Sequence, residues 1–175
     1  MIPTFHKHLL TAVIAPHGIT DIIHALQHNT TAELVAYNTA SLVSSHFLSE
    51  HLPLLLDEAF IVASIVHFRH DMPVNALIPK YAMSGALLLA SIQYDPNILF
   101  GYMVLIHVPN HYKTNWKFMK DAPYKNVGGV VAFSLLLVVF GEYFPWLFHS
   151  KLLFDMSKGI VVSHVLYNEK YIHMR

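Results

Sequence analysis

The sequence predicts an all-α protein: a single integral-membrane domain, residues 1–175, built as a polytopic bundle of six or seven transmembrane helices. Two observations support this prediction. First, 54% of the 175 residues are hydrophobic and only 13% are charged, about half the charged share of ordinary soluble domains. Second, apolar runs recur along the chain at roughly the 17–25 residues that a helix needs to cross a bilayer.

Seven candidate spans follow one another, with turn signals between most of them. The turn signals are Asn29-Thr30-Thr31, Pro53, Asp71-Met72-Pro73, Asp95-Pro96 and Asp121-Ala122-Pro123. Such residues favour turns and interrupt helices. The run from Val127 is the most apolar and the run from Ala32 is the most polar, so six spans remain an alternative to seven. The expected spans are 9–27, 32–49, 53–70, 74–93, 96–112, 126–148 and 152–170.

Basic residues predict the orientation of these spans. Lysine and arginine concentrate in cytoplasmic loops, and the stretch 113–125 holds four lysines. If this stretch is cytoplasmic and the spans alternate, seven basic residues lie inside and only Lys7 and Lys151 lie outside. We therefore expect a multi-pass membrane protein with a cytoplasmic C-terminus.

Charge and cysteine content exclude several classes of function. The 11 basic and 11 acidic residues cancel, so no charge field favours a nucleic acid partner. The chain has no cysteine, which excludes disulfides, zinc ribbons and cysteine-ligated iron–sulfur clusters. The bilayer is the expected partner.

Histidine is the over-represented residue, with 14 in the chain. Five histidines fall late in odd-numbered spans, at one depth of the bilayer, and His17 lies nearer the midplane. Polar groups inside a membrane are costly and mark functional sites. We therefore expect an imidazole cluster in the cytoplasmic half of the bundle. The five are His24, His67, His107, His111 and His164.

The spacing of these histidines predicts a metal centre. Residues four apart share a helix face, and His107 and His111 have this spacing, as do His17 with Asp21 and His67 with Asp71. Imidazoles without cysteine suit zinc, iron, copper or nickel, and the spacing does not choose among them. Pro109 either distorts the His107/His111 geometry or, by kinking the helix, aims both rings inward.

The order of these motifs resembles one known family. His17-Gly18-x-x-Asp21 comes first, then His67-Phe68 with Asp71, then Tyr102 before His107-x-Pro109-x-His111, and finally Ser163-His164. This order resembles the Brp/Blh family of membrane-bound β-carotene dioxygenases, which supply retinal to microbial rhodopsins. Arg69 stands where the family pattern has a glycine.

The resemblance implies an activity and a set of site residues. It implies a non-haem iron oxygenase that splits the central double bond of β-carotene with O2 to give retinal, with a functional link to a retinal-binding rhodopsin. The implied Fe(II) ligands are His17, His67, His107 and His111. Asp21 and Asp71 are the implied carboxylates beside them, and His24 and His164 are further candidates.

Three alternatives stay open from the sequence. A di-iron lipid desaturase or hydroxylase also uses histidine pairs, although the chain has no His-x-x-His-His motif. A zinc-dependent membrane hydrolase uses histidine and aspartate to activate water. A non-catalytic, histidine-rich membrane transporter would carry the same intramembrane polar groups.

Overall fold

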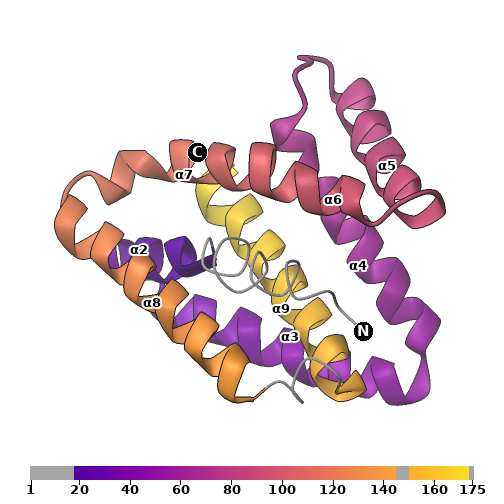
Figure 1. Ribbon diagram of the computed structural model, residues 1–175, viewed down its shortest axis with the longest axis horizontal. Coiled ribbons are helices and arrows are strands. Elements are labelled where there is room, and N and C mark those ends of the chain that lie inside the picture. Colours follow the sequence, from indigo (N-terminus) through magenta and orange to yellow (C-terminus); the bar gives the residue numbers. More distant parts are fainter. Residues whose placement is uncertain (1–17, 145–149, 174–175) are drawn as a thin grey trace.

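The computed structural model describes residues 18–144 and 150–173, which are mostly helical, with short turns between the helices, and contain no strand (Figure 1). The predicted all-α class is therefore confirmed. The elements are α2 (Ile19–His28), α3 (Thr31–His51), α4 (Pro53–Phe68), the 3-10 turn η3 (Arg69–Asp71), α5 (Leu77–Gln93), α6 (Asn97–Tyr102), the π-helical turn η4 (Met103–His107), α7 (Val108–Met119), α8 (Pro123–Tyr143), α9 (Lys151–Asn168) and the π-helical turn η6 (Glu169–His173).

Several helix boundaries lie at the predicted turn signals. Asn29 ends α2 in the left-handed conformation, with φ 56°, and its N–H donates to the Ala25 carbonyl. Asparagine tolerates this conformation better than most residues. Pro53 and Pro123 occupy the first turns of α4 and α8, where the missing N–H removes no helical hydrogen bond.

The predicted span 96–112 and the predicted loop 113–125 differ from the structure. The chain runs through α6, η4 and α7 without leaving the helical conformation, and α7 continues to Met119. Most of the lysine-rich stretch is therefore helix rather than loop. Pro109 lies in the first turn of α7, directly after the π-helical turn. The change of helical period here explains how the helix accommodates proline.

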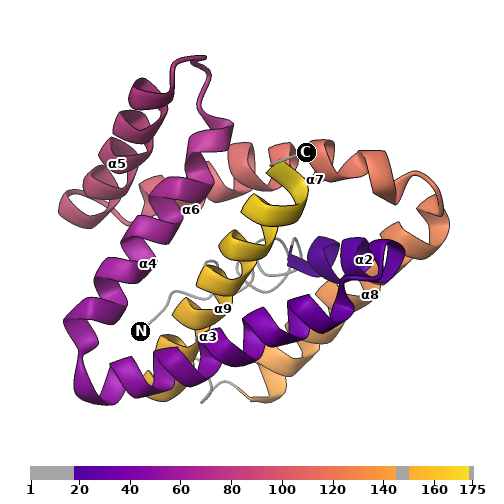
Figure 2. The same cartoon turned by 180° about the vertical axis from the view of Figure 1, so that it is seen from behind.

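The helix α9 is central to the arrangement and packs against both α3 and α4 (Figures 1 and 2). The backbone of α9 lies close to α3 at Gly159. A Cβ atom added there would lie 2.5 Å from Ser45 Oγ and 2.7 Å from the Ser41 carbonyl oxygen. Only glycine fits this crossing, because real Cβ contacts are not that short.

The described residues form two small hydrophobic clusters. One consists of Ala25, Leu34 and Tyr167, from α2, α3 and α9. The other, from α4, α5 and α6, is built on Phe68 and Leu88, with Tyr102 beside them. The second cluster adjoins a buried histidine, because the ring centroids of Phe68 and His107 lie 5.1 Å apart.

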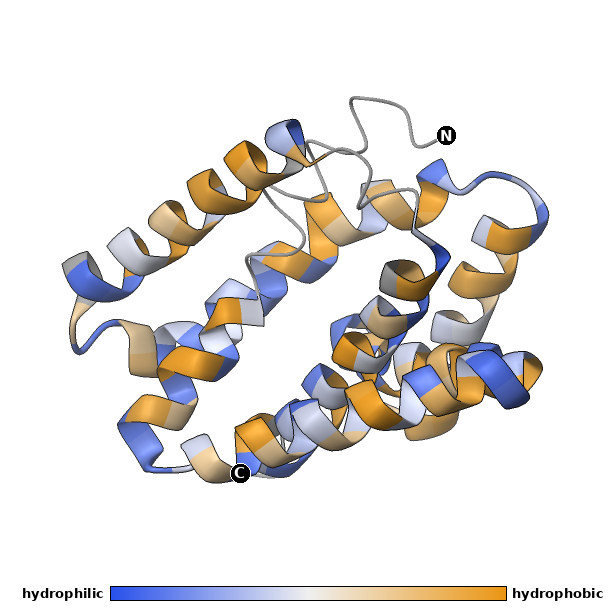
Figure 3. Ribbon diagram, turned by 90° about the horizontal axis from the view of Figure 1, so that it is seen from below, coloured by the Kyte–Doolittle hydropathy of each residue, from blue (hydrophilic) through white to orange (hydrophobic). Residues whose placement is uncertain are grey.

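Much of the apolar surface is exposed. On α8, Leu135 is 62% exposed and Leu136 is 60% exposed. Figure 3 shows hydrophobic residues along the helices and hydrophilic residues at several of the turns that join them. Across residues 18–144 and 150–173, none of the helices has both the length and the apolar character needed to cross a bilayer. Residues 9–17 of the predicted span 9–27 and residues 145–149 lie outside the described part of the chain.

Candidate metal centre

Three histidines from three different helices converge at one point. His67 is the last residue but one of α4, His111 lies in α7 and His164 lies in α9. Each offers one ring nitrogen, and these nitrogens all lie within 4.8 Å of one another. His67 and His111 are buried, and His164 is nearly so. Three ligand atoms so close together can hold one metal ion.

A fourth imidazole adjoins this group. The His107 ring centroid lies 4.7 Å from that of His67 and 5.4 Å from that of His111. His107 ends η4 and His111 lies in the next turn, so the π-helical turn and α7 together place both rings on one side. We call His67, His107, His111 and His164 the imidazole cluster.

Asp71 orients His107. His107 Nδ1 donates to Asp71 Oδ2 at 2.7 Å, and Tyr102 donates to the same oxygen at 2.8 Å. Asn110 donates to Oδ1 at 3.1 Å. Burial by itself raises the pKa of Asp71, but the hydrogen bonds from these three partners and the attraction of His107 outweigh it, so the pKa lies below its ordinary value. The carboxylate is therefore ionised.

Asp21 orients His164 in the same way. His164 Nδ1 donates to Asp21 Oδ2 at 2.7 Å, and Asn168 donates to Asp21 Oδ1 at 2.9 Å. The two partners lie 143 positions apart in the chain. Asp21 comes from α2, so this pair ties the first described helix to α9.

Asn115 contacts the Nδ1 atom of a third member of the imidazole cluster, His111. Its amide lies 2.9 Å from His111 Nδ1 and 2.9 Å from Thr20 Oγ1. Asn115 is fully buried. Each of these three histidines therefore has a polar side chain at Nδ1.

This arrangement fits a divalent metal. A carboxylate only accepts hydrogen bonds, so Nδ1 of His107 and of His164 carries a proton, and Nε2 is the ring nitrogen through which each could bind a metal. Metal-binding histidines commonly have this geometry, with the second ring nitrogen bonded to a carboxylate or carbonyl. An all-imidazole donor set suits iron as well as zinc.

The structure brings together some of the predicted site residues and separates others. His67, His107 and His111 lie together, and His164 joins them. His17 lies outside the described residues. His24 is buried elsewhere: its Nδ1 lies 2.9 Å from the Tyr167 hydroxyl.

The expected pairing of each aspartate with the histidine four residues before it is wrong for Asp71. The helix α4 ends at Phe68, and a 3-10 turn follows. Met72 is extended, as expected for a residue that precedes proline. Asp71 therefore leaves the helix face of His67 and bonds His107 instead.

Sequence reasoning missed the three asparagines. Asn110 follows His107 by three residues, Asn115 follows His111 by four, and Asn168 follows His164 by four. These spacings put each amide on the helix face of its histidine. A histidine followed by asparagine at this distance, repeated in two helices, is the signal that could have revealed them.

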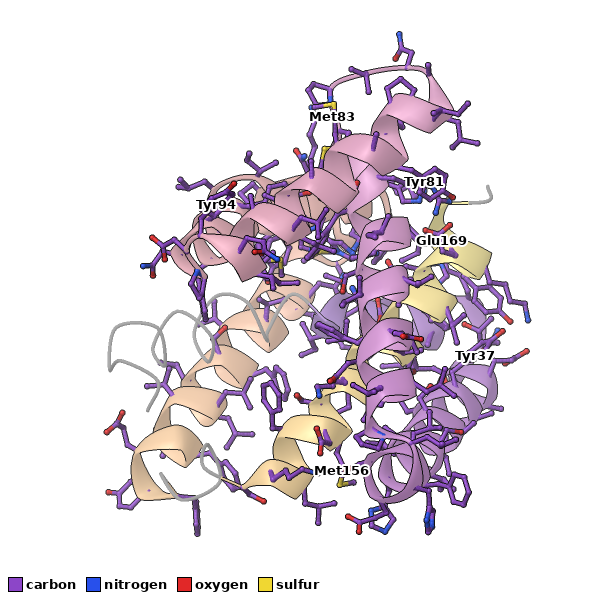
Figure 4. All side chains as sticks on the ribbon, turned by 90° about the vertical axis from the view of Figure 1, so that its right-hand side faces the viewer. Tyr37, Tyr81, Met83, Tyr94, Met156 and Glu169 are labelled. Atoms are coloured by element: carbon purple, nitrogen blue, oxygen red, sulfur yellow. The ribbon has the colours of Figure 1, made fainter. Side chains whose placement is uncertain are left out.

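A polar cavity of about 370 Å³ opens beside the cluster, and all nine residues that line it have polar side chains. Beyond it, Arg69 and His70 both bond Glu169, at 2.6 Å and 2.7 Å. Arg69 also lies over the Tyr81 ring, 5.2 Å from its centroid. Tyr81 and Glu169 are labelled in Figure 4, close to each other near the C-terminal end of α9.

Comparison with known proteins finds no family model, curated protein or solved structure that matches this chain. The function is therefore inferred from the site and the motif order.

Proposed function

We propose that the chain is a membrane-embedded, non-haem iron oxygenase that cleaves the central double bond of β-carotene to give retinal. The observation that carries the proposal is the imidazole cluster, in which two members are bonded to buried carboxylates. The motif resemblance supplies the substrate class. The overall reaction balances without a further reductant, because one O2 and one carbon–carbon double bond give two aldehydes.

His67, His111 and His164 would hold the metal, with His107 beside them; the resemblance adds His17. Bound iron(II) would supply the activation of O2. The protein's own residues would orient the ligands, because Asp21 and Asp71 keep protons on the Nδ1 atoms of His164 and His107.

The exposed apolar surface supports a lipid environment. Side chains such as Leu54, Ile78 and Leu105 are each more than three-quarters exposed, and large apolar surfaces of this kind mark contact with membranes or partners. A β-carotene molecule dissolved in the bilayer would reach such a protein from the side. Retinal formed there would be available to a retinal-binding rhodopsin.

The proposal is tested in cells that accumulate β-carotene. The chain is expressed with iron supplied, its presence in the membrane fraction is verified, and the pigments are separated by chromatography. We expect retinal to replace β-carotene with the wild-type chain and with His46→Ala, because His46 is exposed on α3. His111→Ala should leave β-carotene intact. Retained β-carotene with the wild-type chain in the membrane would refute this substrate.

A zinc-dependent membrane hydrolase is the second candidate, and the polar cavity beside the cluster favours it. Zinc would supply activated water, which this cavity would admit. Metal analysis of protein purified from cells given both metals separates the two functions. Iron supports the oxygenase, and zinc supports the hydrolase.

A further inference from the structure

The cavity beside the imidazole cluster offers hydrogen-bonding groups to a ligand. All nine residues that line it have polar side chains. Its volume of about 370 Å³ lies within the roughly 300–1,000 Å³ of small-molecule pockets. The cavity is therefore large enough for a ligand of its own.

The cavity reaches the imidazole cluster. His67, His107 and His111 are among its lining residues, and two exposed residues of α7, Lys113 and Thr114, lie on it as well. It therefore joins the surface to the proposed metal position on the side of α7.

Charge in the cavity favours an anion. Asp71 contributes one negative charge, but three donors already bond it. Glu169 is not among the lining residues and bonds His70, which is one of them. Lys113 contributes a positive charge, and a divalent metal at the cluster would add two more. An incoming ligand would thus meet a net positive potential.

Asn115 supplies a buried hydrogen-bonding group. The Nδ2 atom of Asn115 lies against His111 Nδ1. The Oδ1 atom is buried and has no hydrogen-bond partner within the described part of the chain. If His111 binds metal through Nε2, its Nδ1 carries the proton and requires the amide oxygen as acceptor. Oxygen and nitrogen of an asparagine amide exchange places by a simple flip. The remaining atom is then the NH2 group, and Asn115 is one of the residues that line the cavity.

We propose that this cavity is a binding site for a small anion, such as a carboxylate or an inorganic anion, held between Lys113, Asn115 and the metal. This inference rests on the metal centre of the proposed function, but not on the carotenoid. Cellular carboxylates and inorganic anions share the chemistry that the cavity recognises, and formate and azide represent the two sources.

The test uses the full chain in detergent, loaded with cobalt(II), whose visible spectrum reports on its ligands. Azide and formate are titrated separately, and the spectral change gives a dissociation constant for each. Lys113→Glu reverses a charge at the cavity, whereas Lys117→Glu makes the same change one turn further along α7, where Lys117 is exposed and outside the lining.

We expect at least one of the two anions to shift the cobalt spectrum with saturation. Lys113→Glu should raise the dissociation constant of that anion roughly threefold or more, which is the effect expected of a charge near the surface. Lys117→Glu should leave the dissociation constant unchanged. Saturable cobalt binding with no response to either anion would overturn the inference and leave the metal centre standing. Equal weakening by both variants would also overturn it. Absence of cobalt binding would overturn both proposals.

Discussion

The two carboxylate–histidine pairs are built alike but held differently. In each, histidine Nδ1 lies 2.7 Å from Oδ2 of an aspartate, and an asparagine from the histidine's own part of the chain donates to Oδ1. The Asp71–His107 pair has a further donor, Tyr102, and lines the cavity. The Asp21–His164 pair lies outside the cavity lining and joins α2 to α9.

The two pairs also differ in how far apart their members lie in the sequence. Asp71 and His107 lie 36 positions apart, and Tyr102 precedes His107 by five residues. Asp21 lies in α2 and His164 lies in α9, which packs against α3 and α4. The Asp71–His107 pair should therefore depend on its own hydrogen bonds, and the Asp21–His164 pair on the placement of α9.

The largest expected effect comes from removing His67 or His111, the two members of the imidazole cluster outside the two carboxylate–histidine pairs. His67→Ala and His111→Ala each remove one of the converging ring nitrogens, so metal affinity should fall by at least about a hundredfold. Changing a group that only orients a ligand costs up to about a hundredfold, and loss of a ligand itself should cost no less. Competition with a chromophoric chelator measures it, and His46→Ala on exposed α3 is the control. Wild-type affinity in His111→Ala would remove that residue from the site.

The aspartates come next. Asp21→Asn and Asp71→Asn each keep the size of the side chain but remove its charge, which should weaken metal binding by about 10–100-fold. The same competition assay measures both. If only one variant loses affinity, the two pairs are not equivalent and the metal is bound on one side of the cluster.

Gly159→Ala tests the dependence on α9. The added methyl group would meet Ser45 and the Ser41 carbonyl, so thermal unfolding in detergent should show a loss of about 1–3 kcal/mol. Gly128→Ala in α8 is the matched control: its added Cβ has open space and should gain roughly 0.5–1 kcal/mol.

The same variant should affect the pairs unequally. His164 lies five residues after Gly159 in α9, so a displaced α9 should disturb the Asp21–His164 pair more than the Asp71–His107 pair. Histidine NMR signals in the Nδ1-proton region would show which pair changes. Loss of the His107 signal alone would contradict the predicted coupling.

Tyr102→Phe should have the smallest effect. It removes one of three donors to Asp71, so stability should fall by about 1 kcal/mol and metal affinity by less than tenfold. Tyr94→Phe, at a side chain that is 86% exposed, should change neither. A loss as large as that of Asp71→Asn would give Tyr102 a direct role at the metal.

The sequence predicted the local features more fully than the long-range ones. Turn residues such as Asn29 and Pro53 act within a few positions, so the helix boundaries near them could be predicted. The His107/His111 pair also depends on local spacing. The partner of Asp71 could not be predicted, because it depends on where α4 ends, which is at Phe68. The meeting of Asp21 with His164 depends on tertiary packing that no local pattern contains.

The most direct test of the metal centre is X-ray absorption spectroscopy of the iron-loaded protein in detergent, at the iron edge. We predict about one iron per chain, with a nitrogen-rich shell and the outer-shell scattering typical of imidazole, and loss of that signal in His67→Ala. An oxygen-only shell, or the same spectrum in His67→Ala, would contradict an iron centre built from these histidines.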